Sequence, residues 1–398
     1  MTSKQMLKEY TDMLFKEAME KKKNGGLICW SSSVVPGELF DAMDISVIYP
    51  ENHAAIIGAK HYSDVLIEHA ENIGYDNGIC SYAKINLAYT DYILNRDKYK
   101  TEIENCPAPE IPLPDIIVVC NNICSLLIKW YENLAVTLNV PFVLIDVPFI
   151  HTGEISQKEV NYILSQFENI KREIEKLTGR KYDEEKLKEE MEQRKRSSIA
   201  WEKVMKLSEK KPSALNGFDL FNFMSLAVCA SYRKCAEDTF NTLYEELKMA
   251  EETNENGMRV FWEGIACWPY LSFTYKTLKN CGFKVSASMY PDMWNVQYST
   301  MEEMAAAFAN IYTNRSLEEK INLISSMGEK SHCDAYVYHQ NRSCKLMSFL
   351  LNETAEGVKS VTGKPYIIFD GDQTDPGNFS QGQFETKVQA LSEMAENY

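Results

Sequence analysis

Short apolar runs recur along the chain, and most are followed by a polar turn and then by residues of helical period. The clearest run is 116–120, which stands between Pro114 and Asn121-Asn122. An unbroken apolar run with such borders is typical of a strand with both faces covered, as in a parallel sheet. Comparable runs occupy 27–30, 45–50 and 141–148. The first part of the chain is therefore predicted to be an α/β unit organised around its 116–120 strand.

The same alternation of strand and helix returns in the last part of the chain. The strands predicted there lie at 259–264, 284–288, 334–338 and 366–369. Between the two parts the pattern indicates helices only, with one at 157–178 ending before Gly179, a charged one after Asp183, and helical sequence within 218–249. Alternation of this kind favours βαβ architecture over a segregated sheet.

These patterns predict an α/β fold of two parallel-sheet, flavodoxin-like units joined by a helical segment. We expect an N-terminal α/β domain at 1–155 with a leading helix at 3–23, a helical connecting region at 156–257, and a C-terminal α/β domain at 258–398. The polar stretch 251–257 is the strongest linker candidate. In such sheets ligands bind at the carboxyl ends of strands, so the turns that follow strands are where chemistry is expected.

Composition indicates a compartment and excludes some partners. The 398 residues include 42 basic and 57 acidic side chains, which gives a formal net charge of −15. This balance argues against nucleic acid or an anionic membrane as the main partner, since either would select a basic surface. The first residues lack the apolar core of a signal peptide, and no apolar run approaches the roughly 20 residues that span a bilayer. We expect a soluble, cytoplasmic protein.

The cysteines indicate a candidate metal centre. There are 11 of them, an odd number at wide spacings without a CxxC pair, so a disulfide framework is not expected. Cys80, Cys124 and Cys344 share one context, because each lies in a polar turn immediately before helical sequence. Three thiolates around one crevice, with a fourth position open, would suit a [4Fe-4S] cluster.

The spacing of the cysteines leaves the choice of ligands open. Cys29, Cys120 and Cys267 occupy comparable strand ends, so the pattern does not say which three cysteines bind. The alternative for each of these cysteines is a structural role, in which the side chain packs as a small buried hydrophobic group.

Other motifs are weaker. The stretch 357–364 resembles a phosphate loop, but five residues separate its glycines and Pro365 replaces the required Ser or Thr, so no ATP site is expected. No GxGxxG fingerprint and no HExxH motif occur. Among the six histidines we consider only His339, next to the 341–344 turn, as a candidate, and a structural role is the alternative for it.

Several motifs in order carry a family resemblance. They are Trp30-Ser31-Ser32-Ser33, Tyr49-Pro50-Glu51-Asn52, Cys120-Asn121-Asn122-Ile123-Cys124, Ile128-Lys129-Trp130-Tyr131-Glu132, Asn216-Gly217-Phe218-Asp219, Glu263-Gly264-Ile265-Ala266-Cys267-Trp268-Pro269, Asn341-Arg342-Ser343-Cys344-Lys345 and Phe369-Asp370-Gly371-Asp372-Gln373. Over essentially its whole length the chain resembles the alpha subunit of the 2-hydroxyacyl-CoA dehydratases. That resemblance implies a heterodimer with a related beta subunit, a [4Fe-4S] cluster in each subunit, and a separate ATP-dependent iron–sulfur activator that injects one electron.

The resemblance also implies roles for individual residues. Carried over by motif, the cluster ligands are Cys80, Cys124 and Cys344, and the catalytic polar pair is Ser33 and Glu51. Without the resemblance, a helix N-cap would be the simpler interpretation of Ser33, and a solvated strand end that of Glu51. The stretch 286–294 matches no defined acyl pocket, so the preferred acyl group stays open.

The implied reaction is the syn-type removal of water from an (R)-2-hydroxyacyl-CoA to give a 2-enoyl-CoA. The hydrogen lost is poorly acidic, but one electron on the thioester carbonyl gives a ketyl radical that can expel the neighbouring hydroxide. In this interpretation Ser33 donates a hydrogen bond to the developing charge and Glu51 handles the hydroxide or the proton. The alternative is a non-catalytic electron-relay or scaffold subunit of such a complex or of a benzoyl-CoA-type reductase, which would not need Ser33 and Glu51.

Overall fold

Two four-stranded parallel sheets form the centre of the protein, whose structure is a computed structural model describing residues 1–150, 154–250 and 257–397. The first sheet has the order β2-β1-β3-β4, with β1 (Ile28–Ser31), β2 (Ser46–Ile48), β3 (Ile116–Cys120) and β4 (Phe142–Ile145). The second has the order β6-β5-β7-β8, with β5 (Met258–Glu263), β6 (Phe283–Ala287), β7 (Ala335–Asn341) and β8 (Tyr366–Gly371). In both sheets the first strand of the unit lies between the second and the third, which is the flavodoxin-like order. The predicted fold class is confirmed.

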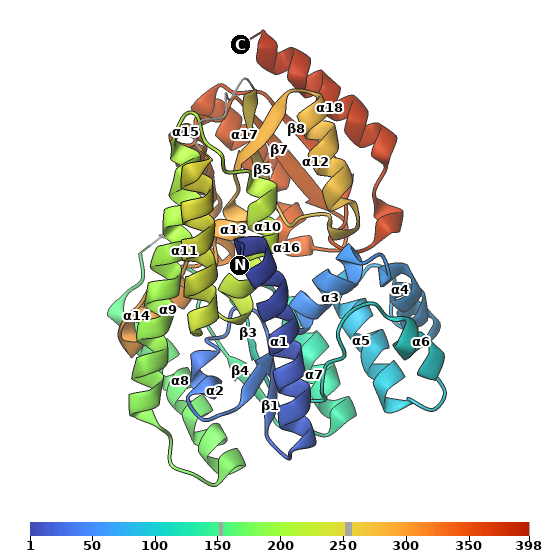
Figure 1. Cartoon of the computed structure of the whole chain (residues 1–398), viewed down its shortest axis with the longest axis vertical. Coiled ribbons are helices and arrows are strands. Elements are labelled where there is room, and N and C mark those ends of the chain that lie inside the picture. The colour runs from blue at the N-terminus through green and yellow to red at the C-terminus, as the bar shows by residue number, and fades with distance from the viewer. Residues whose placement is uncertain (151–153, 251–256, 398) are drawn as a thin grey trace.

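Strand β3 is buried along its whole length, as the apolar run predicted. Ile117 is in register with Trp30 of β1 on one side and with Phe142 of β4 on the other. Interior strands of a parallel sheet have helices on both faces, so every side chain of such a strand meets protein rather than water. In Figure 1 this sheet lies in the lower half of the molecule and the second sheet in the upper half.

Helices of the N-terminal part surround the first sheet. They are α1 (Ser3–Lys23), α2 (Glu38–Asp41), α3 (Pro50–Ala59), α4 (Ser63–Asn72), α5 (Ser81–Leu94), α6 (Lys100–Asn105) and α7 (Ser125–Leu138). Helices α3 and α4 are separated at His61, which adopts a positive φ of 57°. The strand predicted at 45–50 is shorter in the structure, because β2 ends at Ile48 and Pro50 begins α3, where its missing N–H is not needed.

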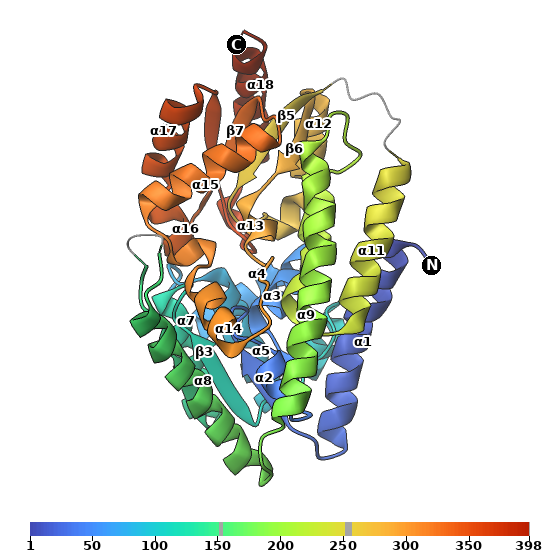
Figure 2. The same ribbon diagram turned by 90° about the vertical axis from the view of Figure 1, so that its left-hand side faces the viewer.

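Long helices connect and flank the two units. They are α8 (Gln157–Thr178), α9 (Glu184–Met205), α10 (Gly217–Cys229) and α11 (Lys234–Met249). Helix α8 has the predicted bounds, with a capping box at its start and Gly179 in the left-handed region at its end. Figure 2 shows α9 running along the molecule from the level of one sheet to that of the other. Of the predicted linker 251–257, residues 251–256 lie outside the described part of the chain.

The C-terminal helices lie around the second sheet, except that α14 (Met301–Ala309) packs against α8 (Figure 2). They are α12 (Leu271–Asn280), α13 (Met289–Asp292), α14 (Met301–Ala309), α15 (Leu317–Lys330), α16 (Lys345–Phe349), α17 (Leu351–Thr362) and α18 (Gln381–Glu396). Strand β7 runs three residues beyond the predicted end, so His339 lies inside the sheet and is fully buried. Within the described ranges, no helix is both long and apolar enough to cross a membrane.

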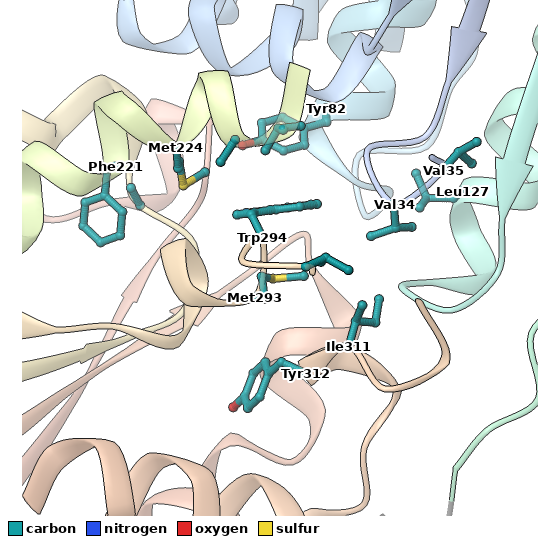
Figure 3. Close-up of a cluster of buried hydrophobic side chains, with 14 of the residues drawn as sticks. Val34, Val35, Tyr82, Leu127, Phe221, Met224, Met293, Trp294, Ile311 and Tyr312 are labelled. Carbon is teal, nitrogen blue, oxygen red and sulfur yellow. The ribbon is translucent and has the colours of Figure 1, made fainter. Parts of the chain in front are cut away.

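Apolar side chains from both units meet between the two sheets. Figure 3 shows Trp294 in this cluster, with Tyr82 from α5 and Met224 from α10 nearby and Val34 on another side. All four of these residues are buried. The hydrophobic core therefore continues from one α/β unit into the other, which holds the turns after their strands in a defined relation.

A buried ion pair joins three elements next to this core. The Glu38 carboxylate, in α2, accepts hydrogen bonds from Arg194 Nη1 of α9 at 3.3 Å and from the hydroxyl of Tyr298, which precedes α14. Both charged side chains are buried. Burial raises the pKa of Glu38, and the guanidinium of Arg194 opposes that rise.

We predict that Arg194→Leu strongly destabilises the protein. The substitution leaves a buried carboxylate without its cation, and breaking such a pair costs about 3–5 kcal/mol. Urea unfolding at pH 7 should show the loss as a lower midpoint. Because protonated Glu38 needs no cation, the loss should shrink as the pH falls through the raised pKa of this group.

Arg196→Leu is the matched control, two residues along the same helix. Arg196 is exposed and its ion pair with Glu237 spans 3.5 Å, the kind of pair that contributes about 0–1 kcal/mol. Equal destabilisation by the two substitutions would contradict the role assigned to the Glu38–Arg194 pair.

Candidate active site

Ser33 and Glu51 come together as the sequence motifs suggested. Ser33 lies in the turn after β1, and Glu51 lies in the first turn of α3, directly after β2. Glu51 Oε1 accepts the backbone N–H of Ser33 at 3.0 Å and the Ser33 hydroxyl at 3.3 Å. The two adjacent parallel strands end at one edge of the sheet, which explains why residues 18 positions apart are in contact.

The other carboxylate oxygen of Glu51 is held by Tyr131. The Tyr131 hydroxyl, from α7, donates to Glu51 Oε2 at 2.5 Å. Burial raises the pKa of Glu51, while the hydrogen bonds from Tyr131 and Ser33 act in the opposite direction. A raised pKa makes a carboxyl group better able to hold a proton, which is a property that a general acid or base can use.

Ser33 and Glu51 line a cavity of about 320 Å³ between the two units. The buried part of its wall is apolar or aromatic, and the described residues in it include Phe221, Met224, Val228, Trp268 and Trp294. Lys8 and Lys60 also line the cavity, but both side chains are exposed. The pair therefore lies against a largely apolar chamber whose lysines stand at the solvent side, a common form of small-molecule site.

Three cysteines cap helices near this cavity. Cys80, Cys124 and Cys344 are the N-cap residues of α5, α7 and α16, which is the local context that the sequence suggested. Burial raises the pKa of Cys80 to about 12, and the charge of Cys124 adds to that rise. Burial also raises the pKa of Cys344, with further contributions from Cys80 and Cys124. The three thiols are thus near enough to influence one another electrostatically.

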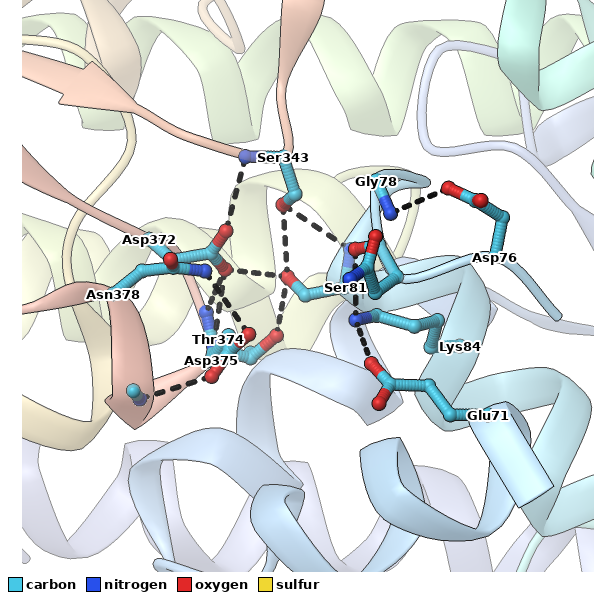
Figure 4. A network of polar contacts seen from close by, with 12 residues as sticks. Glu71, Asp76, Gly78, Ser81, Lys84, Ser343, Asp372, Thr374, Asp375 and Asn378 are labelled. Atoms are coloured by element: carbon cyan, nitrogen blue, oxygen red, sulfur yellow. Dashed lines mark hydrogen bonds and ion pairs between the residues drawn. The ribbon is translucent and has the colours of Figure 1, made fainter.

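A buried carboxylate fastens two of these turns together (Figure 4). Asp372, after β8, accepts hydrogen bonds from the Ser81 hydroxyl at 2.6 Å and from the Ser343 backbone N–H at 3.1 Å. Ser81 directly follows Cys80, and Ser343 directly precedes Cys344. The backbone N–H of Thr374 also donates to this carboxylate, at 3.0 Å. Asp372 therefore ties a turn of the N-terminal unit to a turn of the C-terminal unit.

The three turns offer thiols as possible ligands. In the described ranges, no group of three His, Cys, Asp or Glu side chains is placed to hold one metal ion. Thiolates are the ligands that iron–sulfur clusters use. Cys80, Cys124 and Cys344 are the residues that could hold such a group.

The other strand-end cysteines have different surroundings. Cys29, Cys120 and Cys267 are fully buried within or beside the sheets. Cys267 Sγ lies 3.2 Å from His339 Nε2, and His339 Nδ1 lies 2.6 Å from the carbonyl oxygen of Ile265. The histidine singled out by sequence thus has partners at both ring nitrogens, as a structural residue does.

Tyr290 lines the same cavity as Ser33 and Glu51. Its pKa is raised by burial, and the charges of Cys344 and Glu51 both raise it further. Its hydroxyl also interacts with that of Tyr82, which in turn accepts the indole N–H of Trp268 at 2.5 Å.

Sequence reasoning assigned no role to Tyr290, Tyr131 or Asp372. Tyr131 and Asp372 lie inside the quoted motifs, whereas Tyr290 lies in the stretch that matched no known pocket.

The fold and the geometry of the site together define a class of protein. Two flavodoxin-like units with a carboxylate–hydroxyl pair in an apolar cavity between them make an α/β enzyme with an interdomain site. The family model described as "2-hydroxyglutaryl-CoA dehydratase, D-component" matches residues 32–395. The chain belongs to this family.

Curated relatives agree with the family. The chain is 43% identical to lactoyl-CoA dehydratase subunit alpha of Anaerotignum propionicum, over 100% of this chain and 97% of the relative. It is 38% identical to the (R)-phenyllactyl-CoA dehydratase alpha subunit of Clostridium sporogenes, over 98% of this chain and 95% of the relative. A subunit of the benzoyl-CoA reductase of Thauera aromatica is more distant, at 21% identity over 92% of this chain and 88% of the relative. The resemblance found in the motifs is confirmed, and with it the dehydratase class, a carbon–oxygen lyase.

We predict that Tyr131→Phe raises the pKa of Glu51. The hydrogen bond from Tyr131 favours the ionised carboxylate, so its loss leaves the effect of burial less opposed. Infrared titration should show the protonated carboxyl band persisting to higher pH, and the band can be assigned by its disappearance in Glu51→Gln.

Tyr162→Phe serves as the control for this titration. Tyr162 is an exposed tyrosine that donates to another carboxylate, Asp146, at 2.6 Å. A Glu51 band that titrates alike in Tyr131→Phe and in the unaltered chain would refute the assigned hydrogen bond.

Proposed function

We propose that this chain is the catalytic subunit of an (R)-2-hydroxyacyl-CoA dehydratase that removes water in a syn sense to give a 2-enoyl-CoA. The observation that carries the proposal is the Ser33–Glu51 pair in an apolar cavity, together with the three cysteines at the N-cap positions of α5, α7 and α16. The family and the names of the relatives support the same reaction class.

The residues of the cavity suit the steps of such a reaction. The Ser33 hydroxyl can donate a hydrogen bond to the thioester oxygen, where negative charge develops. Glu51 can give a proton to the departing hydroxide or take the neighbouring hydrogen, because burial brings its pKa upward from that of a free carboxylate. A [4Fe-4S] cluster bound by Cys80, Cys124 and Cys344 would supply one-electron chemistry and an open iron for an oxygen ligand.

The cavity favours a neutral acyl side chain. The described lysines that line it, Lys8 and Lys60, are exposed, and its buried wall is apolar or aromatic. A carboxylate on the acyl group would be buried without a cation and close to Glu51, which is costly. We therefore propose an uncharged aliphatic or aromatic 2-hydroxyacyl group as the substrate class.

The proposed enzyme needs partners. Two relatives are named alpha subunits, which supports a complex of several subunits, and we propose a related beta subunit as the second component. Forming a ketyl from a thioester is far uphill for ordinary reductants, and this chain has no intact phosphate loop. An ATP-dependent iron–sulfur activator is therefore proposed as the source of the electron, acting with this chain in the cytoplasm.

A non-catalytic electron-relay or scaffold subunit is the second candidate, either of such a complex or of a benzoyl-CoA-type reductase. Its support is the distant similarity to the Thauera aromatica benzoyl-CoA reductase. A relay has no use for a serine and a carboxyl group aimed at one cavity, so the Ser33–Glu51 pair favours catalysis.

We predict one cluster in this chain, held by the three capping cysteines. Anaerobic reconstitution should give about four iron and four sulfide per chain. Cys124→Ala should lose most of both, because a thiolate ligand is missing. Cys229→Ala is the matched control, since Cys229 lies at the end of α10 and belongs to none of the three helix starts. Near-zero iron in the unaltered chain after careful reconstitution would refute the cluster.

We predict that Ser33→Ala and Glu51→Gln keep the cluster but lose most of the dehydration. Removal of one donor to a developing charge typically costs about 10²- to 10³-fold in rate. The assay combines this chain with its beta subunit, the activator, MgATP and a strong reductant, and compares neutral with carboxylate-bearing 2-hydroxyacyl-CoAs. Neutral substrates should turn over faster, and many product molecules should form per ATP because the electron is recovered.

Ser165→Ala is the control, an exposed serine on α8 far in sequence from both motifs. Dehydration at the unaltered rate by both the Ser33 and Glu51 variants would favour the relay subunit. Strict consumption of ATP with every product would point to a net reductase.

A further inference from the structure

A hydrogen-bond network of two side-chain amides links Cys80 with Cys344. Gln373 Nε2 lies 3.1 Å from Cys80 Sγ, and Gln373 Oε1 accepts Asn341 Nδ2 at 2.7 Å. Asn341 Oδ1 in turn accepts the backbone N–H of Cys344 at 3.3 Å. Both amide side chains are buried, Gln373 with 1% and Asn341 with 0% of its surface exposed. The network therefore runs from one capping cysteine to another through two buried amides.

The direction of these hydrogen bonds follows from one unambiguous donor. The backbone N–H of Cys344 can only donate, so the atom of Asn341 that faces it must be the oxygen. The Asn341 amide nitrogen then faces Gln373, whose oxygen must accept it. This leaves the Gln373 amide N–H pointing at Cys80 Sγ, and the usual ambiguity of amide orientation is removed.

The position of Gln373 is also held by its backbone. Its carbonyl oxygen accepts the N–H of Trp268 at 3.0 Å, next to the cavity wall. Asn341 is the last residue of β7 and pairs in register with Gly371 at the end of β8. Asn341 thus lies at the end of a strand, and Gln373 lies in the turn that directly follows β8, where the backbone contact with Trp268 holds it.

We propose that Gln373, oriented by Asn341, is a positioning residue that donates a hydrogen bond to Cys80 Sγ and raises the reduction potential of an iron–sulfur cluster held there. The inference rests on the proposed function, since it concerns the same three thiols. Hydrogen bonds to cluster sulfurs stabilise the reduced, more negative state, and are one of the ways in which proteins set cluster potentials. Cys124 Sγ accepts the backbone N–H of Leu126 at 3.3 Å, a hydrogen bond that no side-chain substitution removes. The hydrogen bond from Gln373 to Cys80 Sγ can be removed by substituting one side chain, so its effect can be measured separately.

The test is a redox titration of the full chain after anaerobic reconstitution. Gln373→Leu removes the donor at similar volume, and Asn341→Leu removes the group that orients it. Both variants should retain the iron and sulfide of the unaltered chain and show a more negative midpoint potential by EPR-monitored titration. Gln340→Leu is the matched control, because Gln340 lies beside Asn341 on β7 but donates to the Ser348 carbonyl oxygen at 3.4 Å. The control should keep the unaltered midpoint.

The double variant tests whether the two amides act as one unit. If Asn341 works only by orienting Gln373, adding Asn341→Leu to Gln373→Leu should cause no further shift of the midpoint. The proposal is overturned if Gln373→Leu keeps the unaltered midpoint, if Gln340→Leu shifts it equally, or if the Asn341 effect persists without Gln373. Loss of iron from both single variants also overturns it, because the residues would then serve assembly rather than tuning. An unaltered chain that binds no cluster would instead contradict the proposed function.

Discussion

The buried carboxylate of Asp372 is the contact on which the arrangement of the candidate site depends. It receives hydrogen bonds from residues adjoining Cys80 in one unit and Cys344 in the other. A buried carboxylate is tolerated only where donors satisfy it, so the turns that supply those donors are held in one relative position. A side chain that belongs to neither turn thereby holds the two turns together, and the continuous hydrophobic core supports the same arrangement.

The residues of the candidate site come from both α/β units. The polar pair Ser33 and Glu51 comes entirely from strand ends of the first sheet, whereas the capping thiols come from both units. Tyr290, from the second unit, is influenced electrostatically by Glu51 and by Cys344. Glu51 itself combines opposing influences, since burial favours its protonated form while hydrogen bonds and the start of α3 favour the anion.

The fold alone would not distinguish a dehydratase from a reductase component. Flavodoxin-like units carry many activities, and the distant relative from a benzoyl-CoA reductase matches most of this chain. What separates the two possibilities is local, namely a hydroxyl and a carboxyl group that meet in an apolar cavity. The proposed preference for a neutral acyl group likewise rests on the apolar cavity wall rather than on the topology.

The sequence by itself determined the strands, the fold class and the helix-capping context of Cys80, Cys124 and Cys344, because these depend on local periodicity and turn residues. The motif resemblance also paired Ser33 with Glu51, and the two residues are in contact. Only the tertiary structure decided that Tyr131 holds Glu51 and that Asp372 joins the Cys80 and Cys344 turns. Ser81 and Asp372 are 291 positions apart, and no periodicity relates residues so distant. Their contact arises when both sheets bury their apolar faces and bring the turns after their strands together.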